Sequence, residues 1–208
     1  MKTLAFAALV LVLVLAGCGS EDLDETGAPQ AVTVTETVME TKTVPAEPEV
    51  RCSTAALRLT LPEQELPPEV ADVRERVFGA AVACDYETLE QIALEQGEGF
   101  TFSYGGGDSA AEYWREVEEA GTEQPPPMLA LATILTLPYT RNESGSYAWP
   151  TAYQESPSAA DWQALVDAGL YTQEQVDAMR GTPGAGGYLG YRTAITADGD
   201  WQFFVAGD

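Results

Sequence analysis

The chain opens with a short apolar run that limits which residues can take part in a fold. Lys2 supplies a positive charge, and residues 4–15 follow without a charged residue, a glycine or a proline. A membrane-spanning helix needs about 20 apolar residues. This run is shorter, and it is typical of the apolar region of a secretory signal. We therefore expect residues 1–17 to be a signal peptide that lies outside the folded domain.

The residues that end this run carry a recognisable motif, Leu15-Ala16-Gly17-Cys18. It resembles the lipobox of bacterial lipoproteins, a family in which the cysteine is diacylated and the chain is cut just before it. The resemblance implies that Cys18 is lipidated and anchors the protein at the extracytoplasmic face of the cell membrane. Two acyl chains give stable anchoring. The alternative is a plain signal peptide with an incidental cysteine.

The segment after the motif has the composition of a tether. Its sequence AVTVTETVMETKTVPAEPEV alternates Val with Thr and Glu and contains no aromatic residue. Alternation can indicate a strand, but Pro45 and Pro48 end the stretch and no partner strand is evident nearby. We expect residues 18–51 to be the acylated cysteine and a disordered tether. Residues 52–208 are then long enough for one domain.

Capping residues and apolar periodicity predict the helices of this domain. A helix is expected to start at Pro68, and Asp85 is the expected N-cap of a second, shorter helix. Ser109 and Gly121 have the positions of an N-cap and a C-cap for a third. Three further helices are expected over residues 127–137, 158–169 and 172–181.

Alternation of apolar and polar residues predicts the strands. It is clearest over residues 100–104 and is also present over 57–61. The stretch SYAWP, residues 146–150, is expected to be a further short strand. An Asp198-Gly199 turn is expected to join a C-terminal hairpin of residues 191–195 and 201–208. The predicted fold is α+β, a small antiparallel sheet of about four to five strands with helices packed on one side.

Most of residues 52–208 resemble domains in secreted bacterial proteins of unassigned function. The resemblance lies in the stretches CSTAALRL, VACDYETL, FTFSYGGG and YWRE, and in the tail DGDWQFFVAGD. The order of elements also resembles, loosely, cystatin-like and nuclear-transport-factor-like α+β folds. The resemblance implies a compact domain and supplies no chemistry.

Cys52 and Cys84 are the cysteines that remain once Cys18 is assigned to lipid. An isolated pair in an oxidising compartment usually forms a disulfide. Cys52 opens the domain and Cys84 ends the first predicted helix. A reactive thiol is the alternative, but there is no CxxC spacing and no histidine to lower a thiol pKa. We predict a structural disulfide.

The formal net charge of −23 constrains the partners. Such a surface repels nucleic acid, so no nucleic-acid partner is expected. It favours cations, basic partners or solubility, and it also resembles the surfaces of proteins adapted to high salt. The sequence leaves these explanations open.

Histidine is absent, which removes the commonest general base and transition-metal ligand. We expect no metal and no cofactor. The glycines before Asp108 lack a Walker pattern, and Asp198-Gly199-Asp200 is explained by a hairpin turn. Catalysis by a pair of carboxylates, in a hydrolase acting on cell-wall glycan or peptide, remains the alternative function.

Four aromatic residues are candidates for ligand binding: Tyr147, Trp149, Tyr153 and Trp162. If exposed, they could stack on a sugar or hold a peptide of the cell envelope. The alternative is that Trp149 and Trp162 anchor the core. The function we expect is a non-catalytic binding or accessory module of the cell envelope.

Overall fold

The computed structural model describes residues 52–95, 99–121, 124–181 and 187–207. The predicted signal peptide and tether, with Cys18, lie outside these ranges. The described residues form six α-helices, one 3₁₀ helix and a four-stranded sheet, as the predicted α+β class requires. None of the helices within these ranges combines the length and the apolar character needed to cross a membrane.

The first two helices follow each other with almost no connection. Helix α1 (Pro68–Ala83) begins with proline, whose missing N–H is harmless in a first turn. It ends at Cys84, which has a left-handed backbone with φ of 50°. The Asp85 carboxylate then accepts the N–H of Thr88 at 3.0 Å and caps α2 (Tyr86–Leu94), as predicted.

The next two helices also begin where the sequence predicts. Helix α3 (Ala110–Ala120) has Ser109 as its N-cap and a left-handed Gly121 at its end. Helix α4 (Pro127–Thr136) is buried along nearly its whole length, because its residues are apolar all round. Helices α1 and α4 pack against each other, and α2 packs against α3.

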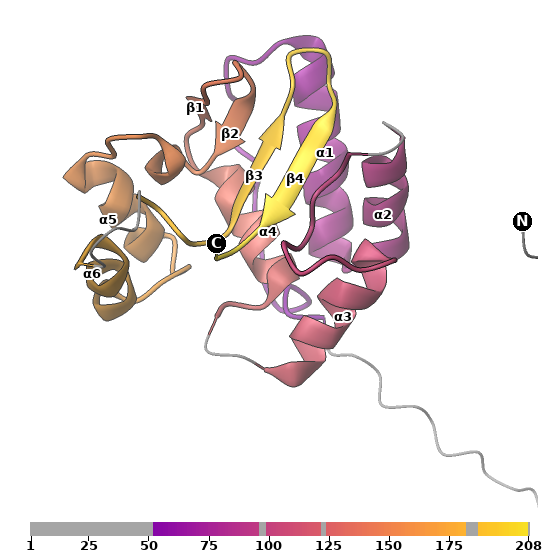
Figure 1. Ribbon diagram of the computed structural model, residues 1–208, viewed down its shortest axis with the longest axis horizontal. Coiled ribbons are helices and arrows are strands. Elements are labelled where there is room, and N and C mark those ends of the chain that lie inside the picture. Colours follow the sequence, from indigo (N-terminus) through magenta and orange to yellow (C-terminus); the bar gives the residue numbers. More distant parts are fainter. Residues whose placement is uncertain (1–51, 96–98, 122–123, 182–186, 208) are drawn as a thin grey trace, which may run out of the picture. The chain divides into compact units, whose positions relative to one another are not determined.

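The strands form a sheet in the order β1-β2-β3-β4, with every neighbouring pair antiparallel. They are β1 (Thr140–Arg141), β2 (Tyr147–Trp149), β3 (Arg192–Ile195) and β4 (Trp201–Val205). The predicted hairpin of β3 and β4 is confirmed, with a register shift after Ala194. Helices α1, α2 and α4 lie on one side of the sheet (Figure 1).

The remaining helices lie between β2 and β3 in the chain. The 3₁₀ helix η1 (Thr151–Tyr153) follows β2 directly, and α5 (Ala159–Asp167) begins at a complete capping box of Ser158 and Asp161. Helix α6 (Gln173–Gly181) follows after a turn at Gly169. Helix α5 packs on η1 and on α6.

The core between the sheet and its helices is rich in aromatic rings. Trp114 of α3 lies 6.0 Å from Trp201 and 5.9 Å from Phe204, measured between ring centroids. Phe100 lies 4.5 Å from Trp201. Trp114, Trp201 and Phe204 are at most 1% exposed, so these contacts join α3 to β4 without water.

The predicted disulfide between Cys52 and Cys84 is present, with a Cα–Cα distance of 5.6 Å. The two residues that follow Cys52 are also held. The Ser53 hydroxyl donates to Glu118 of α3 at 2.9 Å, and the buried Thr54 hydroxyl donates to the carbonyl of Val82 at 2.7 Å. The start of the domain is thus fixed to α1 and α3.

Two predicted strands are wrong. Residues 57–61 pair with no strand of the described chain, and Leu57 is 41% exposed. In the segment 100–104, Thr101 makes a single parallel bridge to Phe203. The turn that closes at Gly106, whose N–H bonds to the Ser103 carbonyl, bends the chain before a strand can extend.

Candidate functional site

The four aromatic residues predicted to bind a ligand do not form one surface. Trp149 is fully buried, and Tyr147 and Trp162 are 8% and 5% exposed. The Trp149 indole N–H donates to Gln64 Oε1 at 3.1 Å, and the ring of Trp162 packs against Tyr188. Burial places these three rings in the core. For Trp149 and Trp162 this is the alternative that the sequence leaves open.

Tyr153 is the member of this group that borders a hollow. The hollow has a volume of about 460 Å³ and lies beside the β1–β2 turn, with Arg141 and Glu155 also in its lining. The half-buried Tyr153 ring meets Phe203 edge-on at 6.0 Å. It lies below the guanidinium of Arg192, at 5.4 Å from the ring centroid. Tyr153 therefore links this hollow to β3 and β4.

Arg192 is a buried cation on β3, with 6% of its surface exposed. Its guanidinium donates to the carbonyls of Gly190 at 3.2 Å and Gly207 at 2.7 Å, and to the Tyr104 hydroxyl at 3.2 Å. Within the described ranges it forms no ion pair with a carboxylate. Uncharged oxygen atoms thus accept the hydrogen bonds of this arginine. Its bond to Gly207 attaches that residue to β3.

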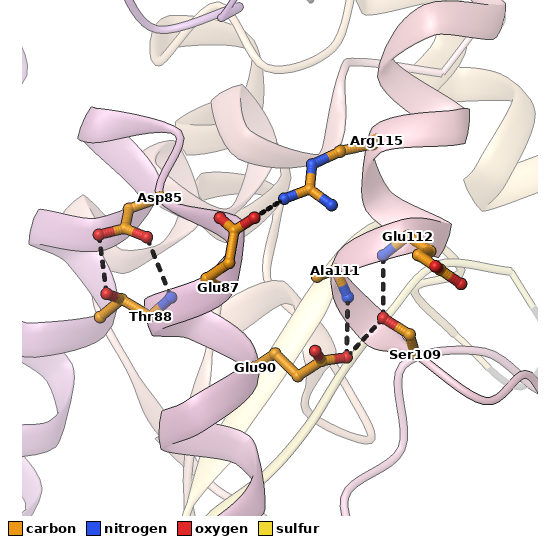
Figure 2. Close-up of polar contacts among 8 residues, drawn as sticks. All are labelled: Asp85, Glu87, Thr88, Glu90, Ser109, Ala111, Glu112 and Arg115. Atoms are coloured by element: carbon orange, nitrogen blue, oxygen red, sulfur yellow. Dashed lines mark hydrogen bonds and ion pairs between the residues drawn. The ribbon is translucent and has the colours of Figure 1, made fainter.

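A second polar cluster joins α2 to the N-terminus of α3 (Figure 2). The Glu90 carboxylate accepts the Ser109 hydroxyl at 2.7 Å and the N–H of Ala111 at 3.2 Å. Ser109 in turn accepts the N–H of Glu112 at 3.1 Å. Above this cluster in Figure 2, Arg115 of α3 pairs with Glu87 of α2. These contacts hold the two helices in one orientation.

The same cluster argues against phosphate binding by the glycines at residues 105–107. A glycine-rich loop before a helix can bind phosphate through the free N–H groups of the first turn. Here the carboxylate of Glu90 already occupies that place, and Asp108 adds a negative charge beside it. The loop instead folds back on Phe102: a Cβ on Gly107 would lie 3.0 Å from that ring.

A groove of about 400 Å³ lies between the second half of α2, residues 99–102 and the start of α3. Leu94, Phe100 and Phe102 supply much of its apolar lining. Leu94 is 64% exposed, which is unusual for a large apolar side chain. The charged residues in the lining, Glu90 and Asp108, are both carboxylates. The groove is therefore apolar at its wall and negative at its rim.

The carboxyl groups whose pKa values are shifted are not suited to acid catalysis. A carboxyl that donates a proton near neutral pH needs a raised pKa. Bonds from Thr88 lower the pKa of Asp85, and the guanidinium of Arg76 lowers the pKa of Glu95. Both groups therefore stay ionised at neutral pH and are not candidates for the proton donor of a hydrolase.

Acidic residues of the described ranges do not gather into a metal site. No group of three His, Cys, Asp or Glu side chains there is placed to hold a metal ion. The Asp198-Gly199 turn is closed by backbone bonds: the N–H of Gly199 donates to the Thr196 carbonyl at 3.1 Å. The N–H of Asp200 donates to the Thr196 hydroxyl at 2.9 Å. This confirms the turn, which explains the motif.

Comparison with known proteins places the chain in no family. No family model, curated protein or solved structure matches it. The resemblances to the lipobox and to secreted bacterial domains therefore stay predictions, and the site must be argued from its own geometry.

Sequence reasoning missed the groove and the buried Arg192. Glu90 and Ser109 are 19 positions apart, and nothing in that spacing indicates that one caps the helix of the other. Phe100 and Phe102 were assigned to a strand by their alternation. The one local signal of the groove is Leu94, an apolar residue at the end of a helix. The structure shows its side chain to be exposed.

Proposed function

We propose that the protein is a lipid-anchored domain of the bacterial cell envelope that binds a protein partner at the extracytoplasmic face. The observation that carries this proposal is the disulfide between Cys52 and Cys84. Disulfides persist in oxidising compartments outside the cytoplasm. That compartment is the one to which the apolar run and the motif ending in Cys18 would deliver the chain.

Binding is better supported than catalysis by the chemistry available. The chain contains no histidine, and its lysines, Lys2 and Lys42, both precede the domain. Nucleophilic catalysis usually relies on one of these residues as its base. The groove beside α2, by contrast, has an apolar wall that includes the exposed Leu94 and a charged rim, which are the ordinary components of a binding site.

The anchor is tested by Cys18→Ala in the full-length chain. Cells fed an alkyne analogue of palmitate should incorporate it into the wild-type protein, because the diacylated cysteine carries the lipid. The variant should incorporate none. Detection by coupling the alkyne to a fluorophore after electrophoresis measures lipidation directly, whether or not the signal peptide is cleaved.

The double variant Cys52→Ala/Cys84→Ala is the matched control, since it removes two cysteines and leaves Cys18. It should be labelled as strongly as the wild type. Label on the Cys18→Ala variant, or an unlabelled wild type, would show that the motif does not direct lipidation and would overturn the anchor.

A further inference from the structure

One wall of the groove beside α2 is a short backbone segment that pairs with β4 on one side. Residues 100–102 run beside β4 (Figure 1), where the N–H of Thr101 donates to the Gln202 carbonyl at 3.1 Å. The Thr101 carbonyl accepts the N–H of Phe204 at 2.9 Å. Both polar groups of Thr101 therefore face β4. In an extended chain the preceding residue, Phe100, directs its N–H and C=O to the opposite side.

Phe100 and Phe102 flank Thr101 on either side. No hydrogen bond within the described ranges reaches the backbone N–H or C=O of either residue. Natural proteins usually cover such an edge or place charge on it, because an unpaired edge accepts a further strand. Here the edge is short, and it is flanked by the end of α2 and the start of α3.

The apolar wall of the groove lies at the same place. Phe100 and Phe102 line it together with Leu94, whose side chain is 64% exposed. A strand added along residues 100–102 would hydrogen-bond to the backbone edge. It would also place alternate side chains against this wall, as in recognition by strand addition. Backbone and side-chain features thus favour the same kind of ligand.

The negative charge of the groove determines which extended ligands it favours. Glu90 and Asp108 line the groove without a cationic neighbour in its lining, and the whole chain carries a formal charge of −23. A segment with lysine or arginine beside its apolar residues would complement both. A second copy of this chain carries the same charge and would be repelled.

We propose that this groove binds an extended segment of a basic partner protein, which adds as a strand along residues 100–102. Its apolar side chains lie against Leu94 and its cationic side chains lie near Asp108. This inference deepens the proposed binding role. It does not depend on lipid at Cys18, so the two proposals can fail separately.

The rival occupant is the valine-rich segment of the protein's own predicted tether. Residues 32–44 alternate in the manner of a strand, but they include Glu36 and Glu40 and a single cation, Lys42. Net negative charge disfavours this segment beside Glu90 and Asp108. The test must nevertheless distinguish it from a separate protein.

The test uses the full chain in detergent and a fluorescein-labelled peptide, Lys-Val-Thr-Val-Lys-Val-Thr-Val-Lys. Fluorescence polarisation should show saturable binding. Leu94→Gln should weaken it about tenfold because the apolar contact is lost, and Asp108→Asn should weaken it at low salt. The control variant Leu57→Gln changes an exposed leucine outside the groove and should bind as the wild type does.

Two altered peptides separate the contribution of charge from that of the backbone hydrogen bonds. A peptide with glutamate in place of lysine should not bind. A peptide N-methylated at alternate residues on the edge-facing side should bind at least several-fold more weakly, because its N–H donors are removed. Equal binding of the lysine peptide to wild type and Leu94→Gln, or no binding at all, overturns the proposal. Binding of the glutamate peptide as tight as that of the lysine peptide also overturns the proposal.

Amide hydrogen exchange of the full chain distinguishes the two possible occupants, a separate protein and the protein's own predicted tether. Without peptide, the amides of Phe100 and Phe102 should exchange rapidly, and peptide should slow them. Slow exchange of both amides before any peptide is added would mean that the chain covers its own edge. That result would overturn binding of a separate protein there.

Discussion

The hydroxyl of Thr193 joins two strands inside the core. It donates to the carbonyl of Phe203 at 2.6 Å and accepts the indole N–H of Trp201 at 2.7 Å. Thr193 is fully buried, so water cannot replace either bond. A single oxygen atom on β3 therefore satisfies two polar groups of β4.

Thr193→Val preserves the shape of this side chain and removes its oxygen. We expect the free energy of unfolding to fall by about 1–3 kcal/mol, because two buried polar groups lose their partner. Urea denaturation followed by tryptophan fluorescence measures the change. Thr60→Val, at an exposed position, is the control and should stay within about 0.5 kcal/mol of wild type. Equal stability of Thr193→Val and wild type would contradict the bridging role.

Residue type alone could not predict which aromatic rings reach solvent. Trp149 and Trp162 lie 13 positions apart in the sequence, yet one packs against Tyr139 and the other against Tyr188. Exposure depends on the neighbours that the fold supplies, and these come from distant positions. The exposed Tyr104, whose hydroxyl accepts a hydrogen bond from Arg192, is 88 positions from that arginine.

At the scale of elements, the disulfide and the contacts of Ser53 and Thr54 attach an irregular segment to the helices. The disulfide closes a loop with a sequence separation of 32 and joins residue 52 to the point where α1 gives way to α2. Such a loop restricts the unfolded chain more than the folded one. Its effect should therefore appear in stability.

The double variant Cys52→Ala/Cys84→Ala tests this contribution. In the loop-closure model its free energy of unfolding should be about 3–4 kcal/mol lower than that of wild type. Urea titrations with and without reductant provide the measurement. Reductant should destabilise the wild type and leave the double variant unchanged. A wild type that is insensitive to full reduction would contradict a stabilising disulfide.

Helices were more predictable than strands because their signals are local. Asp85, Ser109 and Ser158 each cap a helix through a bond to a residue three positions on, and the sequence shows that spacing. A strand needs a partner from elsewhere. Residues 57–61 alternate correctly but have no strand beside them, whereas β3 and β4 are joined by a local turn and were predicted.

For the whole molecule, buried tyrosines set the limit of stability at high pH. Burial raises the pKa of Tyr86 to about 12 and also raises the pKa values of Tyr171, Tyr188 and Tyr191. Below pH about 10 these phenols are protonated in both states. At higher pH the unfolded chain loses protons that the folded protein keeps, so the free energy of unfolding falls.

We therefore expect stability to be steady up to about pH 10 and to fall between about pH 10 and 12. Urea midpoints at a series of pH values measure this fall. Tyr86→Phe should lose less stability over that range, because one of the titrating groups is gone. At neutral pH the variant should match wild type, since the Tyr86 hydroxyl has no hydrogen-bond partner within the described ranges. A fall as steep as that of wild type would contradict the role of Tyr86.

The bond between Cys52 and Cys84 also decides how the domain carries mechanical load. Tension applied at residue 52 crosses the sulfur atoms to Cys84, so residues 53–83, with the whole of α1, are not stretched. About 100 Å of chain that could otherwise extend is withheld from the pull. The force enters the folded domain at Cys84, between the end of α1 and the start of α2. A pull at the start of the domain therefore reaches the folded part at the junction of α1 and α2, without extending residues 53–83.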